Sequence, residues 1–285
     1  TTEHFVIHYQ DQLAEAAERV ALQAERAHEE VGTLFGHVPR RRTHVVMVDD
    51  TDLPNGSASV VPYPRITLNV TAPDSMSVLG GYDDWLNILV THEFVHIAHL
   101  DTSSGVPEFF NKIFGLGNLG KIYSPNVIQP RWIIEGIATF YESDLGSQGR
   151  DRFAQFEMYL RMAVLEGRLE SLSQVTNSSR IFPYGSSVYL YGLHFMKYLV
   201  LTYGRETFAE LSKLYGSRLI PFGINRALED IIGIGFDELW LDFLAASRRT
   251  YEAQARQIRT QGLRQGRRIT FSTNAATSRN HTRYP

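Results

Sequence analysis

Three residues with the spacing of a metal site lie within residues 88–100, which read ILVTHEFVHIAHL. His92 and His96 are four residues apart, so on a helix their imidazoles project from one side, one turn apart, and can reach one ion. Glu93 follows the first histidine and would point toward the open position of that ion. The pattern indicates a metal site with an acid–base group beside it.

The helix that carries these residues is expected to be buried. Apolar side chains occupy most of its circumference, which is typical of a helix inside a protein core. Ionisable groups buried along one stripe of such a helix need partners, because burying an unpaired polar group is costly. A divalent metal is the simplest partner, and since the chain has no Cys, its ligands must be His, Glu or Asp.

A third ligand is needed for catalytic zinc, because H-E-x-x-H supplies only two ligands and a general base. One group of zinc peptidases uses H-E-x-x-H-x-x-G-x-x-H, but the last two fixed positions here are His99 and Thr102, which excludes that option. Glu135 is the alternative, since it is the only charge in the nine residues WIIEGIATF. The alternative role for Glu135 is purely structural, an ion pair with Arg131. Gly136 is expected to let this second helix approach the metal-bearing one closely.

The segments HEFVH and WIIEGIATFYE together resemble the gluzincin zinc peptidases, particularly the alanyl aminopeptidase branch, whose third ligand sits in a W-x-x-E-G-x-A motif. Over residues 1–250, the order HFVIHY, DDTDLPNGSA, YDDWLNILVTHEFVHIAHLD and QPRWIIEGIATFYES looks like bacterial peptidase domains that precede a Tol-type β-propeller. The resemblance implies one Zn²⁺ per chain, held by His92, His96 and Glu135, with Glu93 as general base.

The resemblance also implies an α+β fold of the gluzincin type. It places a small mixed β-sheet with helices in an N-terminal lobe, a mostly helical C-terminal lobe after it, and the metal between the two. It further implies an exported, periplasmic or extracellular location and a C-terminal β-propeller partner, although the sequence shows no signal peptide.

Hydrophobic periodicity predicts where the elements lie. Strands are expected at residues 4–9 and 44–48, with a helix at 11–34 between them, and two short strands at 57–61 and 65–70 that form a sheet edge because of nearby prolines. Helices are expected after Glu135 at residues 152–166, 184–203, 206–215, 224–232 and 236–259. We divide the chain into an N-terminal α+β lobe, residues 1–103, and a helical lobe with the third ligand, residues 104–260. Residues 261–285 are expected to be a basic linker or the start of a downstream domain, with one strand at 268–272.

A tyrosine or histidine that stabilises a developing oxyanion is expected in PYGSSVYLYGLHF, because the aminopeptidase-like branch takes its tyrosine from the start of such a helix. Tyr184 is the preferred candidate, while Tyr191 and His194 are alternatives that are equally well explained as core residues. His99 is expected to lie behind the metal ligands without binding the ion, or to line the cleft. Asp101 either orients a ligand imidazole or ends the helix.

Two features favour an endopeptidase over an aminopeptidase. The aminopeptidases bind the substrate amine with an acid in an edge strand, but the strand RITLNV here contains none. His96 and Glu135 are also 39 positions apart, and the Gly-rich insertion at 104–130 is expected to wall or cover the cleft. A different class of function is the alternative to an enzyme: a non-catalytic binding module that has the peptidase fold.

The charge is unevenly distributed along the chain. From Arg248 onward there are nine arginines and one acid, which leaves 19 basic and 30 acidic residues, a net charge of −11, before it. The scattered arginines favour a helix end and linker over a tail that binds nucleic acid or anionic lipid. No run of 18 apolar residues is present, so no membrane span is expected.

Overall fold

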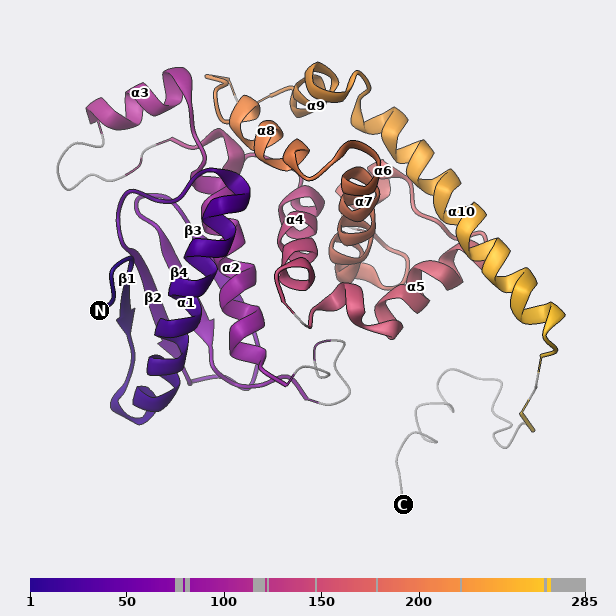
Figure 1. The fold of residues 1–285 in the computed structure, drawn as a ribbon, viewed down its shortest axis with the longest axis horizontal. Helices are drawn as coiled ribbons and strands as arrows, with labels where there is room; N and C mark the ends of the chain where they lie inside the picture. The colour runs from indigo at the N-terminus through magenta and orange to yellow at the C-terminus, as the bar shows by residue number, and fades with distance from the viewer. Residues whose placement is uncertain are drawn as a thin grey trace.

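The computed structural model describes residues 1–74, 79, 83–114, 121, 123–146, 148–177, 179–220, 222–263 and 266–267. The fold is mixed α+β, mostly helical with one four-stranded sheet, which confirms the expected class. Figure 1 shows the sheet with two covering helices at one end of the molecule, α3 above that end, and most of the remaining helices at the other end. The predicted strand at 268–272 and most of the predicted linker lie outside the described residues.

The sheet contains the strands β1 (Phe5–His8), β2 (Thr43–Val48), β3 (Gly56–Ser59) and β4 (Arg65–Asn69) in the order β1-β2-β4-β3. β2 pairs in parallel with both β1 and β4, whereas β3 runs antiparallel to β4 and forms one edge. The sheet is therefore mixed, as expected. The prediction of an edge is right for β3 and wrong for β4, which lies between two partners.

Two helices pack beside this sheet. α1 (Ala14–Phe35) buries an apolar stripe that includes Val20, Ala24 and Val31, and it ends at Gly36, whose φ of 57° requires a left-handed conformation. α2 (Trp85–Asp101) is buried over almost its whole length, as the sequence predicts, and the Asp84 side chain caps it by accepting a hydrogen bond from the Asn87 N–H. This burial holds the H-E-x-x-H residues in a fixed orientation.

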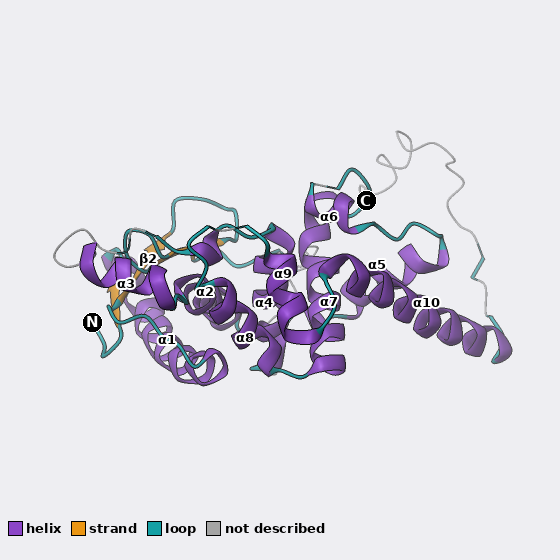
Figure 2. Ribbon diagram, turned by 90° about the horizontal axis from the view of Figure 1, so that it is seen from above, coloured by secondary structure: helices purple, strands orange, loops and turns teal. Residues whose placement is uncertain are grey.

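The rest of the described chain is helical (Figures 1 and 2). Its α-helices are α3 (Gly105–Phe114), α4 (Arg131–Asp144), α5 (Ala154–Leu165), α6 (Leu172–Thr176), α7 (Ser187–Tyr203), α8 (Glu206–Tyr215), α9 (Ile224–Ile232) and α10 (Phe236–Thr260). Short 3-10 turns precede several of them, including η2 (Pro125–Val127), η3 (Arg150–Arg152) and η4 (Tyr184–Ser186). In the part of the chain that the structure describes, no helix is long and apolar enough to cross a membrane.

One continuous cluster of buried apolar side chains joins the two ends of the molecule. It runs from Phe5 on β1 through α2, α4 and α7 to Tyr251 on α10. The predicted boundary at residue 103 falls between α2 and α3. The side chains of the candidate site thus project from elements fixed by a shared core.

The close approach at Gly136 differs from the prediction. A Cβ on Gly136 would lie 2.7 Å from the backbone of Gly192 on α7, and a Cβ on Gly192 would lie 2.5 Å from the Trp132 carbonyl oxygen. The small residue therefore brings α4 against α7 and not against α2. The reason is geometric, because Gly136 follows Glu135 in the helix and so faces about 100° away from it.

Candidate metal centre

The structure brings together the three predicted ligands. The Nε2 atoms of His92 and His96, both on α2, lie 3.2 Å apart, and the Glu135 Oε2 atom from α4 lies 3.5 and 3.4 Å from them respectively. These are the residues in the described chain that could hold a metal ion. Ligand atoms around a tetrahedral zinc ion, about 2.1 Å from the metal, are about 3.4 Å from one another. The spacing and the His₂Glu donor set therefore fit a zinc ion.

A cleft of about 440 Å³ opens onto this cluster. Its walls come from β3, α2, α4, η3 and the start of α7, and its floor contains the two histidines, Glu93 and Glu135. The edge strand β3 contributes Gly56, Ser57 and Ala58 to one wall. A strand edge that no described strand pairs with therefore lies beside the candidate metal centre.

Glu93 lies in the same cleft, almost wholly buried. Its Oε2 atom has no hydrogen-bond partner among the described residues, and burial raises the pKa of its carboxyl group. A Cβ on Gly56 would be only 2.5 Å from Oε1, so a side chain at position 56 would displace this carboxylate. The arrangement suits a group that exchanges a proton with a small molecule in the cleft.

Glu142 orients the first histidine, a role that the sequence analysis did not assign to it. His92 donates from Nδ1 to Glu142 Oε2 at 3.0 Å, which leaves Nε2 to face Glu135 and His96. Arg150 donates to both oxygens of Glu142, from Nε and Nη2, at 2.8 Å each. Glu142 is seven residues after Glu135 and so lies two turns along the same face of α4. This spacing is the feature of the sequence from which its position near the site could have been predicted.

The pKa values follow from burial and from these hydrogen bonds. Burial by itself lowers the pKa of His92, but its hydrogen bonds to Glu135 and Glu142 outweigh burial and raise it to about 9. Burial raises the pKa of Glu142, but the charge and hydrogen bonds of Arg150 lower it to about 2. For Glu135, hydrogen bonds from His92 and His96 overcome burial and hold its pKa well below the usual range. A positive charge among these atoms is therefore favoured.

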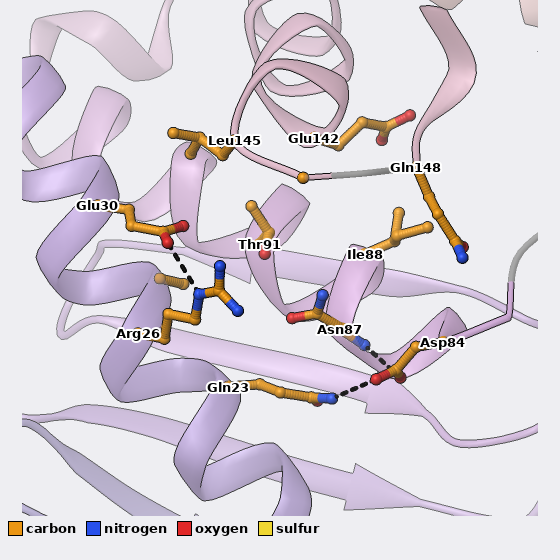
Figure 3. A pocket seen from close by; sticks show the side chains of 12 residues that line it. Gln23, Arg26, Glu30, Asp84, Asn87, Ile88, Thr91, Glu142, Leu145 and Gln148 are labelled. Carbon is orange, nitrogen blue, oxygen red and sulfur yellow. Dashed lines mark hydrogen bonds and ion pairs between the residues drawn. The ribbon is translucent and has the colours of Figure 1, made fainter. Parts of the chain in front are cut away.

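A second, smaller pocket is lined by Glu142 together with residues of α1 and α2 (Figure 3). It has a volume of about 200 Å³ and polar walls from α1 and α2, including Gln23, Asn87 and Thr91. Glu142 and Ile88 line both pockets, so they form part of the wall between this hollow and the metal cleft.

Tyr189, and not Tyr184, lies at the cleft. The Tyr184 side chain is 60% exposed and does not line the cleft, because it belongs to η4, which precedes α7, and contacts Phe182 instead. Tyr189 lies on α7, lines the cleft and shares a 3.1 Å hydrogen bond with Arg131, whose Nε atom donates to Glu135 Oε1 at 3.3 Å. Both interpretations of Glu135 therefore agree with the structure, since its carboxylate lies near the two histidines and also pairs with Arg131.

The alternative candidates lie away from the cleft. The Tyr191 hydroxyl accepts from the Glu170 N–H, and the ring packs against Trp240 in the core. Burial lowers the pKa of His194 to about 4, on α7 near Asp151 and Lys197. Tyr191 therefore has the core role that was its alternative explanation. His194 does not line the cleft either, but it is only partly buried and its Nε2 atom has no hydrogen-bond partner among the described residues.

His99 and Asp101 also have other surroundings. His99 is buried against Phe35, does not line the cleft, and has a pKa lowered by burial to about 3. Asp101 is the last residue of α2, which is one of its two expected roles, and it accepts from His37 at 2.8 Å and from Lys121 at 2.9 Å. The carboxylate that orients His92 is that of Glu142.

The insertion at 104–130 does not wall the cleft where the structure describes it. α3, η2 and the described residues beside them contribute nothing to the lining of the cleft, and α3 lies at the edge of the molecule (Figure 1). Residues 115–120 and 122 of the insertion lie outside the described residues.

Neither a family model nor a solved structure matches the chain. An uncharacterized protein of Treponema pallidum (strain Nichols) is 30% identical to it over 213 residues. The match covers 74% of this chain but 18% of the Treponema protein, so the chain spans less than a fifth of that relative's length.

Proposed function

We propose that this chain is a zinc-dependent metallopeptidase of the gluzincin type, with endopeptidase activity. The observation that carries the proposal is the cluster of His92, His96 and Glu135, whose facing atoms have the mutual distances that a tetrahedral ion needs. Glu93 and the strand edge in the same cleft supply what peptide hydrolysis needs besides the ion.

His92, His96 and Glu135 would hold the zinc ion, with His92 kept in its ligating orientation by Glu142. When bound, zinc supplies a Lewis acid that activates water and polarises a peptide carbonyl. Glu93 accepts the proton of the attacking water on its unpartnered Oε2 atom and passes it to the leaving amine. Burial raises the pKa of Glu93, which favours the first transfer because a more basic carboxylate accepts the proton of water more readily.

Tyr189 is the group that would donate a hydrogen bond to the oxyanion. Its hydroxyl group is anchored by Arg131, and the Arg150 guanidinium lies 4.8 Å from the centre of its ring. These contacts hold the side chain in one orientation, as electrostatic preorganisation requires.

An extended peptide would bind along β3. Among the described residues, its outer edge pairs with no strand, so it can form backbone hydrogen bonds with a substrate. The strand that lines the cleft is β3, with sequence GSAS. The strand that the sequence analysis compared with the amine-binding strand of the aminopeptidases is β4, with sequence RITLN. Neither contains an acid, and the carboxylates in the described lining are Glu93, Glu135 and Glu142, all assigned to other roles. This supports internal cleavage over recognition of a substrate amine.

A digest of a peptide library tests the proposal. The wild type with zinc should cut at internal bonds, and Glu93→Gln should retain zinc but lose activity by at least about a thousandfold, because it cannot accept a proton. Trimming from the amino terminus alone would instead support the aminopeptidase alternative. Zinc binding without any cleavage would support the peptidase-fold binding module and contradict the proposal.

The exported location and the downstream β-propeller also remain proposals. They rest on the resemblance of the sequence to exported peptidase domains, and the Treponema relative's much greater length leaves room for further domains in that protein.

A further inference from the structure

α3 has the reverse of the amphipathic arrangement found on ordinary surface helices. Val106, Phe109 and Ile113 have i, i+3 and i+7 spacing and form one stripe, yet they are 44–60% exposed. The polar face points toward the protein instead, where Asn111 bonds to the backbone of Tyr123 and Glu108 pairs with Arg40. An apolar stripe that the chain itself leaves in water indicates an external partner.

A second exposed apolar group lies next to this stripe. Leu219, Ile220 and Phe222, in the connection between α8 and α9, are 57–74% exposed. Their segment is fixed to the chain around α3, because the Ser104 N–H donates to the Gly216 carbonyl at 3.2 Å and the Tyr123 hydroxyl donates to that of Leu219 at 2.7 Å. The two groups therefore form one surface, which we call the α3 surface.

Positive charge lies beside the α3 surface. A cavity of about 370 Å³ under the polar face of α3 is lined by four cationic side chains and two carboxylates: Arg40, Arg41, Lys112 and Lys121, with Asp101 and Glu108. This local excess of positive charge contrasts with the net charge of −11 on the chain before Arg248. The charge beside the apolar stripe is thus complementary to an anionic surface.

We propose that the α3 surface binds a membrane that contains anionic lipids, with α3 lying in the interface plane. A short helix with apolar side chains on one face and lysine or arginine beside them is typical of such binding. The apolar side chains of α3 and of the α8–α9 connection enter the boundary between headgroups and acyl chains. Arg40 and Lys112 share the carboxylate of Glu108, at 2.9 and 2.8 Å, so this group carries a net positive charge that attracts lipid phosphates, an attraction that salt screens. This site is separate from the metal cleft and does not rest on the proposed peptidase activity.

A protein partner fits these observations less well. The centre of a protein interface is usually depleted of charged residues, whereas the exposed cations Arg40 and Lys112 lie at α3, where both pair with Glu108. The apolar side chains also come from two short segments and not from a groove, and a lipid interface can surround separate side chains.

Vesicle sedimentation with the 285-residue chain tests the proposal. The chain should bind vesicles of phosphatidylcholine with phosphatidylglycerol, bind pure phosphatidylcholine vesicles at least about tenfold more weakly, and lose affinity in high salt. Phe109→Ser combined with Ile113→Ser should weaken binding at least about tenfold, since two apolar side chains no longer enter the interface. Arg40→Gln combined with Lys112→Gln should weaken binding to anionic vesicles by about tenfold.

The matched control is Leu22→Ser combined with Leu241→Ser. These two leucines, on α1 and α10, are at least as exposed as the α3 stripe but lie outside the α3 surface, so the double variant should bind like the wild type. Equal loss in this control, equal binding to neutral and anionic vesicles, or no binding to either would overturn the proposal. So would a chain that forms dimers through Phe109 and Ile113 in solution, measured by light scattering, and ignores vesicles.

Discussion

Glu142 shows how one buried carboxylate can serve both folding and chemistry. Arg150 donates to both carboxylate oxygens of Glu142, and Glu142 also accepts a hydrogen bond from the Nδ1 atom of His92. A buried carboxylate without such partners would be strongly destabilising. The arrangement fixes the direction of the His92 ring, and hence the position of Nε2, at the candidate metal centre.

We therefore expect Glu142→Gln to weaken zinc binding by about 10- to 100-fold, because the amide orients His92 less firmly and reduces its basicity. Competition with a chromogenic chelator at fixed pH measures the affinity. Glu166→Gln is the control, since Glu166 follows α5 and lies outside the cleft. Unchanged affinity in Glu142→Gln would mean that the hydrogen bond to His92 has no role in metal binding.

Removing the hydroxyl group of Tyr189 and that of Tyr184 should have different effects on peptide hydrolysis. Tyr189→Phe should lower kcat by about 100-fold or more with little change in KM, because the lost hydrogen bond acts on the transition state. Tyr184→Phe should leave both constants unchanged, since Tyr184 is exposed and does not line the cleft. Steady-state kinetics on one internally cleaved peptide compares them, and the reverse result would restore the sequence-based choice of Tyr184.

Residue spacing was sufficient for some members of the site and not for others. His92, Glu93 and His96 lie within one helical turn or so, and Glu135 was conspicuous as a lone charge in an apolar segment. Arg150 and Tyr189 reach the cleft only through tertiary packing of η3 and α7 against α4. No local pattern indicates that packing, and the choice of Tyr184 rested on the resemblance, which places a tyrosine at the start of such a helix.

At the scale of elements, the contact between α4 and α7 positions the site. Gly136 and Gly192 face one another so closely that the two backbones touch. α4 carries Glu135 and Glu142, and α7 carries Tyr189, so this contact sets the distance between the third ligand and the tyrosine.

Gly192→Ala should destabilise the fold by about 3 kcal/mol, because its Cβ would lie 2.5 Å from the Trp132 carbonyl oxygen and 2.8 Å from Gly136 Cα. The free energy of unfolding from urea denaturation measures the effect. Gly185→Ala is the matched control, since nothing lies within 4 Å of a Cβ at that position, and it should change stability little. Equal stability of the two variants would contradict the close helix contact.

The elements themselves were largely predictable, but their arrangement was not. Period-2 and period-3.6 patterns gave the four strands and most of the helices to within a few residues. The order β1-β2-β4-β3 and the partner of Gly136 depend on contacts between distant segments, so a local pattern cannot supply them. This is why β4 was expected at an edge and Gly136 against α2.

At the scale of the whole molecule, the candidate site joins two parts of one core. α2 packs on α1 and the sheet, whereas α4 packs on α7 among the other helices, and the ligands come from both. A zinc ion held by His92, His96 and Glu135 would therefore link the sheet-bearing end to the helical end. The α3 surface lies outside this region, so metal binding and membrane binding can be tested separately.

The zinc content of the purified chain, measured by elemental analysis after dialysis, tests the central claim most directly. We expect about one zinc per chain for the wild type and for Glu93→Gln, and strongly reduced zinc for Glu135→Ala, which removes a ligand. A wild type without zinc, even after incubation with zinc and removal of the excess, would contradict the account. So would a Glu135→Ala variant that retains the wild-type zinc content.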